Sequence, residues 1–137
     1  MRRFVLCALV ALMTAACGDT PTVPTLPNTN PVTETFSNTL APNGAFTNPF
    51  TVNGPGPVTA TLTTIAPDTT VAVGFTLGTW NATTSVCSAT LSNDLAIQGS
   101  ALTATAQTAG VYCVRVFDVG KVTAGTSTTY TVTVTHP

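Results

Sequence analysis

Apolar and polar residues alternate along most of the chain after Glu34. The clearest example is PVTATLTTI, residues 57–65, in which Val58, Ala60 and Leu62 share one side of an extended chain and threonines share the other. Period-two alternation over a short segment is typical of a half-buried β-strand. Segments rich in Gly, Pro, Asn and Asp interrupt the pattern and predict turns.

The alternation predicts about eight short strands, with a turn about every ten residues. Because this spacing leaves no room for helical crossovers, the pattern predicts an antiparallel β-sandwich or barrel. Ser92-Asn93-Asp94 is interpreted as a break that ends a strand. The predicted strands are residues 34–40, 45–52, 57–65, 70–80, 85–91, 100–106, 110–119 and 128–136.

Each predicted strand is expected to point one set of side chains into a core. In residues 110–119 the inward set alternates with Cys113, Arg115 and Phe117, which are expected to point outward. The expected inward residues are Val58, Ala60, Leu62, Val71, Val73, Phe75, Leu77, Tyr112, Val114, Val116, Tyr130, Val132 and Val134.

Residues 1–16 have a different pattern, that of an export signal. Two arginines precede an uncharged apolar run, Phe4–Met13, which ends in small residues. This order is typical of a secretory signal peptide. The run is shorter than the ~20 residues that a membrane-spanning helix needs. Residues 1–16 are therefore excluded from the predicted fold.

Cys17 follows this signal directly. Small residues before a cysteine resemble the bacterial lipobox, in which the thiol receives a diacylglyceryl group, although Thr14 stands where the lipobox prefers leucine. Two other interpretations remain: cleavage after Ala16 without lipid, and an incidental cysteine within a signal that is cut elsewhere. The preferred interpretation predicts lipidation of Cys17. The protein would then be anchored in a bacterial cell membrane or outer membrane, facing the periplasm or the exterior.

Residues 17–33 are the predicted tether between this anchor and the domain. Prolines recur there at roughly three-residue spacing among Thr and Asn, without any hydrophobic period. Such a segment favours an extended chain with polyproline II bias, or plain disorder. Residues 34–137 then form a single domain.

Composition narrows the function further. Thirty of the 120 residues from Gly18 onward are threonine, which favours pleated strands and keeps a sheet face wet without charge. The same segment has two basic and five acidic residues, a net charge of two minus five, or −3. Binding to nucleic acid needs several lysine or arginine contacts to phosphate, so a nucleic-acid partner is not expected.

Cys87 and Cys113 are the only cysteines in the predicted domain. An even cysteine count in an exported chain predicts a disulfide. A disulfide between them would close a loop of 27 residues. In the chain-entropy model, closing such a loop is expected to contribute about 3–4 kcal/mol to stability.

Two strands near the C-terminus carry a resemblance to a known family. AGVYCVRVFDVG, residues 109–120, contains G-x-Y-x-V-x-V, and TTYTVTVTHP, residues 128–137, contains Y-x-V-x-V. Together with ETFSNTLAPNGAFTNPFTV, residues 34–52, they resemble the pre-peptidase C-terminal (PPC) domain family over nearly all of the predicted domain. The resemblance implies a jelly-roll-like β-sandwich that acts as a non-catalytic accessory module.

Groups suited to catalysis are few. His136 is the only histidine, Glu34 is the only glutamate, and no G-x-S-x-G motif occurs. A Ser-His-Asp set and a four-ligand zinc site are therefore not expected. We expect a protein that is not an enzyme, with no catalytic residue and no dedicated metal site.

The candidate ligand-binding residues are Trp80, Asn93, Asp94 and Asp118. Trp80 ends a predicted strand, where an exposed indole can stack on a sugar, although a lone tryptophan also packs at a core edge. The other three offer oxygen ligands of the kind that calcium prefers. Solvated turn residues are the alternative interpretation of Asp94 and Asp118, as of Asp68.

These patterns together predict a non-catalytic, lipid-anchored envelope protein that displays a β-sandwich for binding or structural support. The alternative is a carbohydrate- or calcium-dependent binding module that acts through loops near Trp80 and Asp94. The expected partners are the membrane and a cell-surface polysaccharide or protein.

Overall fold

The computed structural model describes residues 30–137, and every regular element among them is a β-strand. The predicted signal peptide, Cys17 and the tether up to residue 29 lie outside the described residues. Among residues 30–137 no helix could span a membrane. The strands are β1 (Val32–Leu40), β2 (Ala45–Val52), β3 (Gly56–Ala66), β4 (Val73–Asn81), β5 (Val86–Ala96), β6 (Ala101–Ala106), β7 (Gly110–Asp118) and β8 (Thr128–His136).

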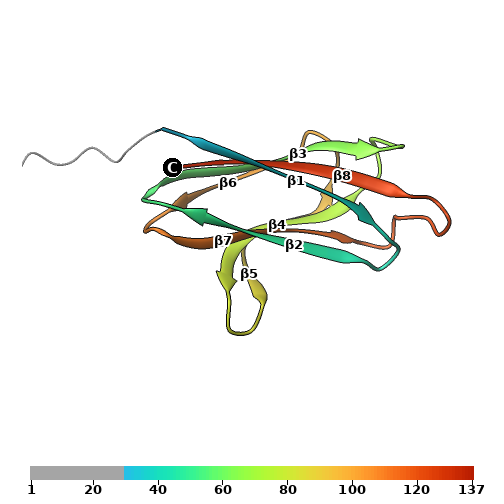
Figure 1. Ribbon diagram of the computed structural model, residues 1–137. Helices are drawn as coiled ribbons and strands as arrows, with labels where there is room; N and C mark the ends of the chain where they lie inside the picture. The colour runs from blue at the N-terminus through green and yellow to red at the C-terminus, as the bar shows by residue number, and fades with distance from the viewer. Residues whose placement is uncertain (1–29) are drawn as a thin grey trace, which may run out of the picture.

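The strands form two antiparallel sheets that pack face to face (Figure 1). The first sheet has the order β1-β8-β3-β6, and the second has the order β2-β7-β4-β5. The pairs are nested: β1 pairs with β8, β2 with β7, β3 with β6, and β4 with β5. This is the arrangement of a jelly roll. The predicted all-β sandwich of about eight strands is confirmed.

The core lies between the sheets and contains the residues that the alternation predicts, together with others such as Leu40, Phe50, Val52 and Ile65. Val58, Ala60 and Leu62 are fully buried on β3, and Val132 and Val134 are fully buried on β8. The second sheet adds a matching set from its own inner face. Its fully or almost fully buried members are Phe50, Val52, Val73, Phe75, Leu77, Val114 and Val116, while Val71 and Tyr112 are partly buried against the core.

Threonine hydroxyls cover the outer face of the first sheet. The strand registers align Thr33, Thr135, Thr59 and Thr103 in one row across the four strands. The hydroxyl oxygens are 3.3 Å apart in the first pair and 3.2 Å apart in the last pair. Since these side chains hydrogen-bond without carrying charge, they explain how a chain with few ionic groups keeps a sheet face polar.

β5 is longer than predicted. The expectation that Ser92-Asn93-Asp94 ends a strand is wrong, because β5 continues to Ala96. The β4–β5 pairing shifts register twice, between Val73 and Phe75 and between Leu77 and Gly78 of β4. Each shift places one extra residue on β5, which makes a β-bulge and increases the local bend and twist of the strand. Polar residues that resemble a turn therefore lie within a bulged strand.

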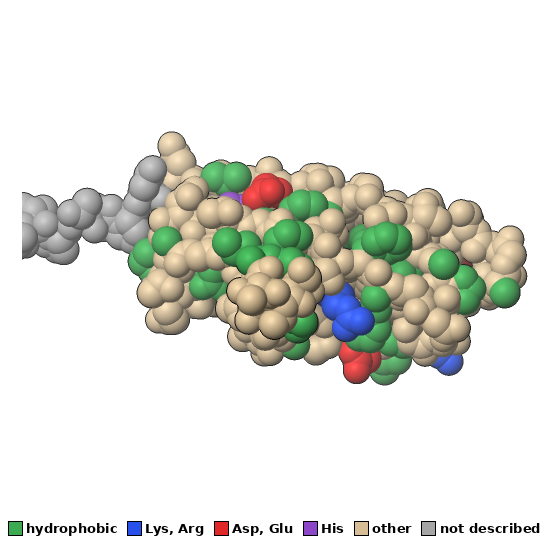
Figure 2. Space-filling model, turned by 60° about the horizontal axis from the view of Figure 1, so that its bottom comes forward, with side chains coloured by type: hydrophobic (Ala, Val, Ile, Leu, Met, Phe, Trp, Pro, Cys, Tyr) green, Lys and Arg blue, Asp and Glu red, His purple; other side chains and the backbone are tan. Residues whose placement is uncertain are grey.

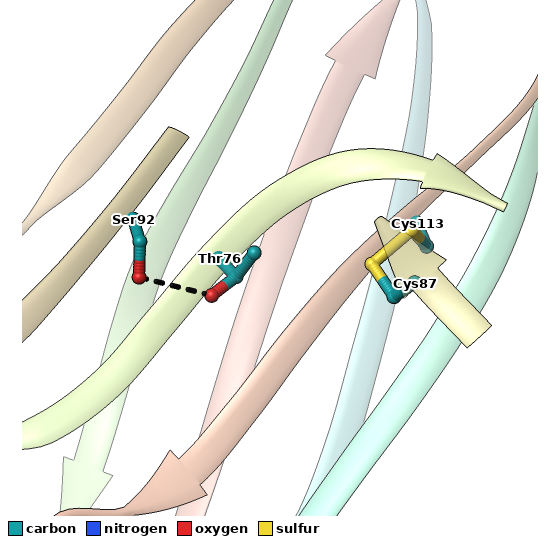
Figure 3. The surroundings of a disulfide bond; sticks show 4 residues. All are labelled: Thr76, Cys87, Ser92 and Cys113. Carbon is teal, nitrogen blue, oxygen red and sulfur yellow. Dashed lines mark hydrogen bonds between the residues drawn. A yellow bond between two sulfur atoms is a disulfide. The ribbon is translucent and has the colours of Figure 1, made fainter. Parts of the chain in front are cut away.

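The predicted disulfide between Cys87 and Cys113 is present, and it joins β5 to β7 with β4 between them in the sheet (Figure 3). Gly78 of β4 lies opposite Cys113. A Cβ atom at Gly78 would overlap the carbonyl oxygen of Ser88, so β5 folds closely over this glycine. The fold brings the two cysteine Cα atoms within 5.8 Å. Cys113 has the predicted outward phase, yet it is fully buried because this crossing covers it.

Removal of the disulfide is expected to lower the free energy of unfolding by about 3 kcal/mol, because the unfolded chain regains the entropy of a loop closed over 26 residues. The measurement is urea unfolding of the wild type and of the Cys87→Ala/Cys113→Ala variant, each with and without reductant. Reductant should shift the wild-type midpoint to that of the variant and leave the variant unchanged. An unchanged wild-type midpoint under full reduction would contradict this account.

Candidate functional site

Trp80 lies on the β4–β5 arm, which we define as the hairpin of residues 78–89. The arm projects from the second sheet (Figure 1). Trp80 is partly buried and pairs in register with Cys87, so its side chain shares a sheet face with the disulfide. Asn81 closes the tip, where its side-chain oxygen accepts the backbone N–H groups of Thr83 and Thr84 at 3.0 and 3.2 Å. The indole therefore sits on an arm that is fixed at both its base and its tip.

Asn93 and Asp94 lie within β5, in the region of its second bulge. The Asn93 side-chain oxygen accepts the backbone N–H of Leu95 at 3.0 Å. The carboxylate of Asp94 accepts the hydroxyl of Ser92 at 3.1 Å. Ser92 in turn lies 3.2 Å from the hydroxyl of Thr76 on β4 (Figure 3). Both polar side chains thus bond to their own strand and stabilise the bulged pairing.

The structure does not bring Trp80 and Asp94 into one loop. Trp80 pairs with Cys87, whereas Phe75 pairs with Asn93, the residue before Asp94, so at least five positions along β4 separate Trp80 from Asp94. At strand rise this is about 16 Å. Within residues 30–137, no group of three His, Cys, Asp or Glu side chains is close enough to hold a metal ion.

Asp118, at the end of β7, joins two loops at one end of the sandwich. One carboxylate oxygen accepts the backbone N–H of Asn43, in the β1–β2 turn, at 2.8 Å. The other accepts the N–H groups of Lys121 and Val122, in the β7–β8 loop, at 2.8 and 3.0 Å. The backbone N–H of Asp118 also donates to the carbonyl oxygen of Gly44 at 2.9 Å. This carboxylate is therefore occupied by backbone amides and organises the end of the jelly roll.

These contacts change the acidity of Asp118. Partial desolvation of the carboxylate raises its pKa, but the backbone amides that donate to it outweigh this effect and hold the pKa below its ordinary value of 3.8. Asp68 behaves similarly in the β3–β4 connection, where the Thr70 hydroxyl and backbone N–H donate to it at 2.7 and 2.9 Å and lower its pKa.

Arg115 and Phe117 are neighbours on the outer face of the second sheet. The Phe117 ring lies across Gly74 of β4, where a Cβ atom would overlap it. The Arg115 guanidinium lies 4.8 Å from the centre of the same ring, in cation–π geometry. Figure 2 brings this side of the molecule forward and shows charged side chains that are few and scattered among uncharged ones. The face therefore offers one stacked cation rather than a charged patch.

Glu34 and His136 form a pair at the opposite end of the sandwich from Asp118. The imidazole Nε2 lies 3.0 Å from the Glu34 carboxylate, and Nδ1 lies 3.0 Å from the carbonyl oxygen of Pro137. His136 is almost fully buried and lies against the Phe50 ring, with the two ring centres 5.3 Å apart. Both imidazole nitrogens face oxygen acceptors, so only the doubly protonated ring donates both hydrogen bonds. The pair links the start of β1 to the end of β8.

A cavity of about 370 Å³ lies beside this pair, at the end of the sandwich where β1 begins and β8 ends. Its walls are mainly apolar, with threonine hydroxyls as the main side-chain polar groups. The smaller cavity, of about 160 Å³, lies near Asp68 and the β7–β8 loop. The larger one is lined by Pro31, Pro55, Gly56, Pro57, Thr59, Thr135, His136 and Pro137.

Tyr130 carries a buried hydroxyl within the core. Its side chain is 1% exposed, and the hydroxyl has no hydrogen-bond partner of ordinary geometry within the described part of the chain. Burial raises the pKa of this hydroxyl above its ordinary value of 10.0, and the approaching side chain of Asn48 offsets part of the rise. The hydroxyl therefore stays protonated and acts as a polar feature of the core.

Sequence reasoning did not identify the Glu34–His136 pair or the proline-lined cavity. Glu34 and His136 are 102 positions apart in the sequence, and only the β1–β8 register brings them together. The prolines that line the cavity likewise come from distant parts of the chain: Pro31 precedes β1, Pro55 and Pro57 flank Gly56 at the start of β3, and Pro137 follows β8. A usable signal was that the only histidine and the only glutamate occupy the last and first strands of the domain.

Comparisons with known proteins add no family to this description. No protein-family model matches the chain. No curated protein matches it either. The strand topology and the cross-link of the described residues define the class of protein, a disulfide-braced, all-β jelly-roll sandwich.

Asp118→Asn is expected to destabilise the domain by about 1 kcal/mol at pH 7, because the amides lose an ionised acceptor that is partly screened by solvent. The folded pKa lies below the unfolded value of 3.8. The stabilisation is therefore complete above pH 3.8 and is lost as pH falls through the lower, folded pKa.

The measurement is urea unfolding of both proteins between pH 2 and pH 7, in steps of about one pH unit. The difference between wild type and variant should shrink as the pH falls below 3.8, the pKa of the unfolded state. Asp94→Asn is the matched control, because Asp94 accepts one side-chain hydroxyl and no backbone N–H. A difference that stays constant down to the lowest pH, or an equal effect in the control, would contradict the assignment.

Proposed function

We propose that the chain is a non-catalytic, lipid-anchored bacterial envelope protein that displays its jelly-roll sandwich for binding or structural support. The observation that carries the proposal is the position at which the described chain begins. Asn30 precedes β1 at one end of the elongated sandwich, while the β1–β2 turn and the β7–β8 loop lie at the other end (Figure 1). A tether that joins at this end leaves the far end and the β4–β5 arm accessible.

The length of the intervening chain suits this role. Val32 lies fifteen positions after Cys17, and at about 3.1 Å per residue an extended tether would span about 46 Å. A tether of this length would hold the domain clear of the membrane surface. A cell-surface polysaccharide or protein is the proposed partner.

The hydrogen bonding of the acidic residues supports a non-catalytic role. Glu34 bonds with His136, Asp68 accepts two hydrogen bonds from Thr70, and Asp118 accepts backbone amides from two loops. Each of these carboxylates is positioned by contacts that hold the chain together. The jelly-roll topology also supports the resemblance to PPC domains, for which an accessory role is the implied function.

The proposal is tested by the mass and location of the processed protein. The wild type should end in the membrane fraction and begin at Cys17, with the added mass of a diacylglyceryl group and further acyl chains. Cys17→Ser should lose both the added mass and the membrane association. Cys87→Ser/Cys113→Ser is the matched control and should keep both. A wild-type protein that begins at an unmodified Cys17 would overturn the anchored part of the proposal.

A further inference from the structure

Three of the four sheet edges carry features that block pairing with another strand. β2 contains Pro49, which has no N–H to donate, and β6 has only six residues. β5 carries both bulges. Prolines, short strands and bulges are common protections of exposed sheet edges. The edge of β1 has none of them: it is nine residues long and contains no proline, lysine or arginine. Its pairing with β8 is continuous from Val32 to Leu40.

The sequence of β1 is chemically symmetric about its middle residue, Phe36. Reading outward from Phe36 on the side that faces the second sheet, Glu34 corresponds to Asn38, and Val32 corresponds to Leu40. The outer side carries only hydroxyl residues, namely Thr33, Thr35, Ser37 and Thr39. An antiparallel pair of identical strands centred on Phe36 would therefore match aromatic with aromatic, acceptor with donor, apolar with apolar and hydroxyl with hydroxyl.

We propose that two copies of the chain pair antiparallel through β1, with Phe36 on the twofold axis. The first sheets of the two copies would form one continuous eight-stranded sheet. Such an interface is isologous, because each copy contributes the same strand. The backbone groups of β1 that face away from β8 gain partners, which is the physical advantage of adding a strand to a free edge.

Unused hydrogen-bonding groups on β1 support this register. The Asn38 side-chain oxygen accepts the backbone N–H of Thr39 at 2.8 Å, and its NH₂ group makes no hydrogen bond within residues 30–137. One Glu34 carboxylate oxygen bonds to His136 at 3.0 Å, and the other makes no hydrogen bond within the same residues. The proposed register places Asn38 of each copy opposite Glu34 of the other, so a free donor meets a free acceptor twice.

Exposed apolar surface at the start of β1 supports the register as well. Val32 is 42% exposed, although it lies on the side of β1 that faces the second sheet. The register places it beside Leu40 of the second copy and gives it an apolar cross-strand neighbour. A register centred on Thr35 would instead oppose Glu34 with Phe36, and one centred on Ser37 would oppose Glu34 with Leu40. Both would place a carboxylate against an apolar side chain.

The proposal depends on the edge of β1 and not on the lipid anchor, so the two can fail separately. The experiment is sedimentation equilibrium of the full chain in detergent, over a range of protein concentrations. Asn38 is exposed, and therefore its replacement should leave the monomer folded. Asn38→Glu places like charges opposite each other at two positions. It should weaken the dimer at least about tenfold, which corresponds to about 1.4 kcal/mol.

Asn38→Lys is the opposite test, because it places a cation against Glu34 of the second copy at both positions. It should tighten the dimer by a factor of about two to five. Thr105→Glu and Thr105→Lys carry the same charges on β6, at the opposite edge of the first sheet, and should leave the dissociation constant within about twofold of the wild type. Circular dichroism and thermal unfolding of each variant report that the fold is retained.

Three results would overturn the proposal. The first is a wild-type protein that stays monomeric at every concentration, as expected if another segment covers β1. The second is a shift in the same direction for Asn38→Glu and Asn38→Lys. The third is a Thr105→Glu variant that dissociates as much as Asn38→Glu, which would indicate association through net charge or micelles rather than through β1.

Discussion

The fold depends on the burial of alternate side chains between the two sheets. Valine, leucine and aromatic residues occupy the inner positions, and threonine occupies many of the outer ones. In β8, the sequence TTYTVTVTH, the buried residues Tyr130, Val132 and Val134 alternate with threonines that are exposed or partly exposed. A register slip by a single residue would place threonines in the core and valines in water. The native register is therefore strongly favoured over such a slipped pairing. The hydrophobic effect thus selects both the inner face and the register.

The nested pairing makes most contacts long-range. β1 pairs with β8 across about a hundred residues, whereas β4 and β5 form the one nested pair that is a local hairpin. The disulfide braces this innermost hairpin to β7, and Gly78 provides the space that lets β5 cross so closely. At the far end of the sandwich, Asp118 ties together two loops that the strand pairing alone leaves free. The core, the cross-link and the carboxylate therefore restrain different parts of one roll.

The local features of the fold could be predicted from the sequence, because period-two alternation is a property of each strand alone. The inner residues of β3, β7 and β8 were predicted in this way, and the disulfide was predicted from the even number of cysteines in the domain. The features that were missed depend on tertiary pairing. Ser92-Asn93-Asp94 resembles a turn, but pairing with β4 extends it into a bulged strand. Cys113 has an outward phase, yet the bend of β5 buries it. Of the candidate ligand residues, Trp80 and Asp94 were expected in neighbouring loops, and only the register shows how far apart they lie.

The most direct test of the account is the position of β8 in the first sheet. Val132 lies in register with Phe36 of β1 on one side and with Leu62 of β3 on the other. Backbone nuclear Overhauser effects in the labelled protein should therefore connect the Val132 strand position to both neighbours. Backbone contacts that pair Val132 with β7 in one sheet, as in a simple up-and-down meander, would contradict the nested jelly roll and everything derived from it.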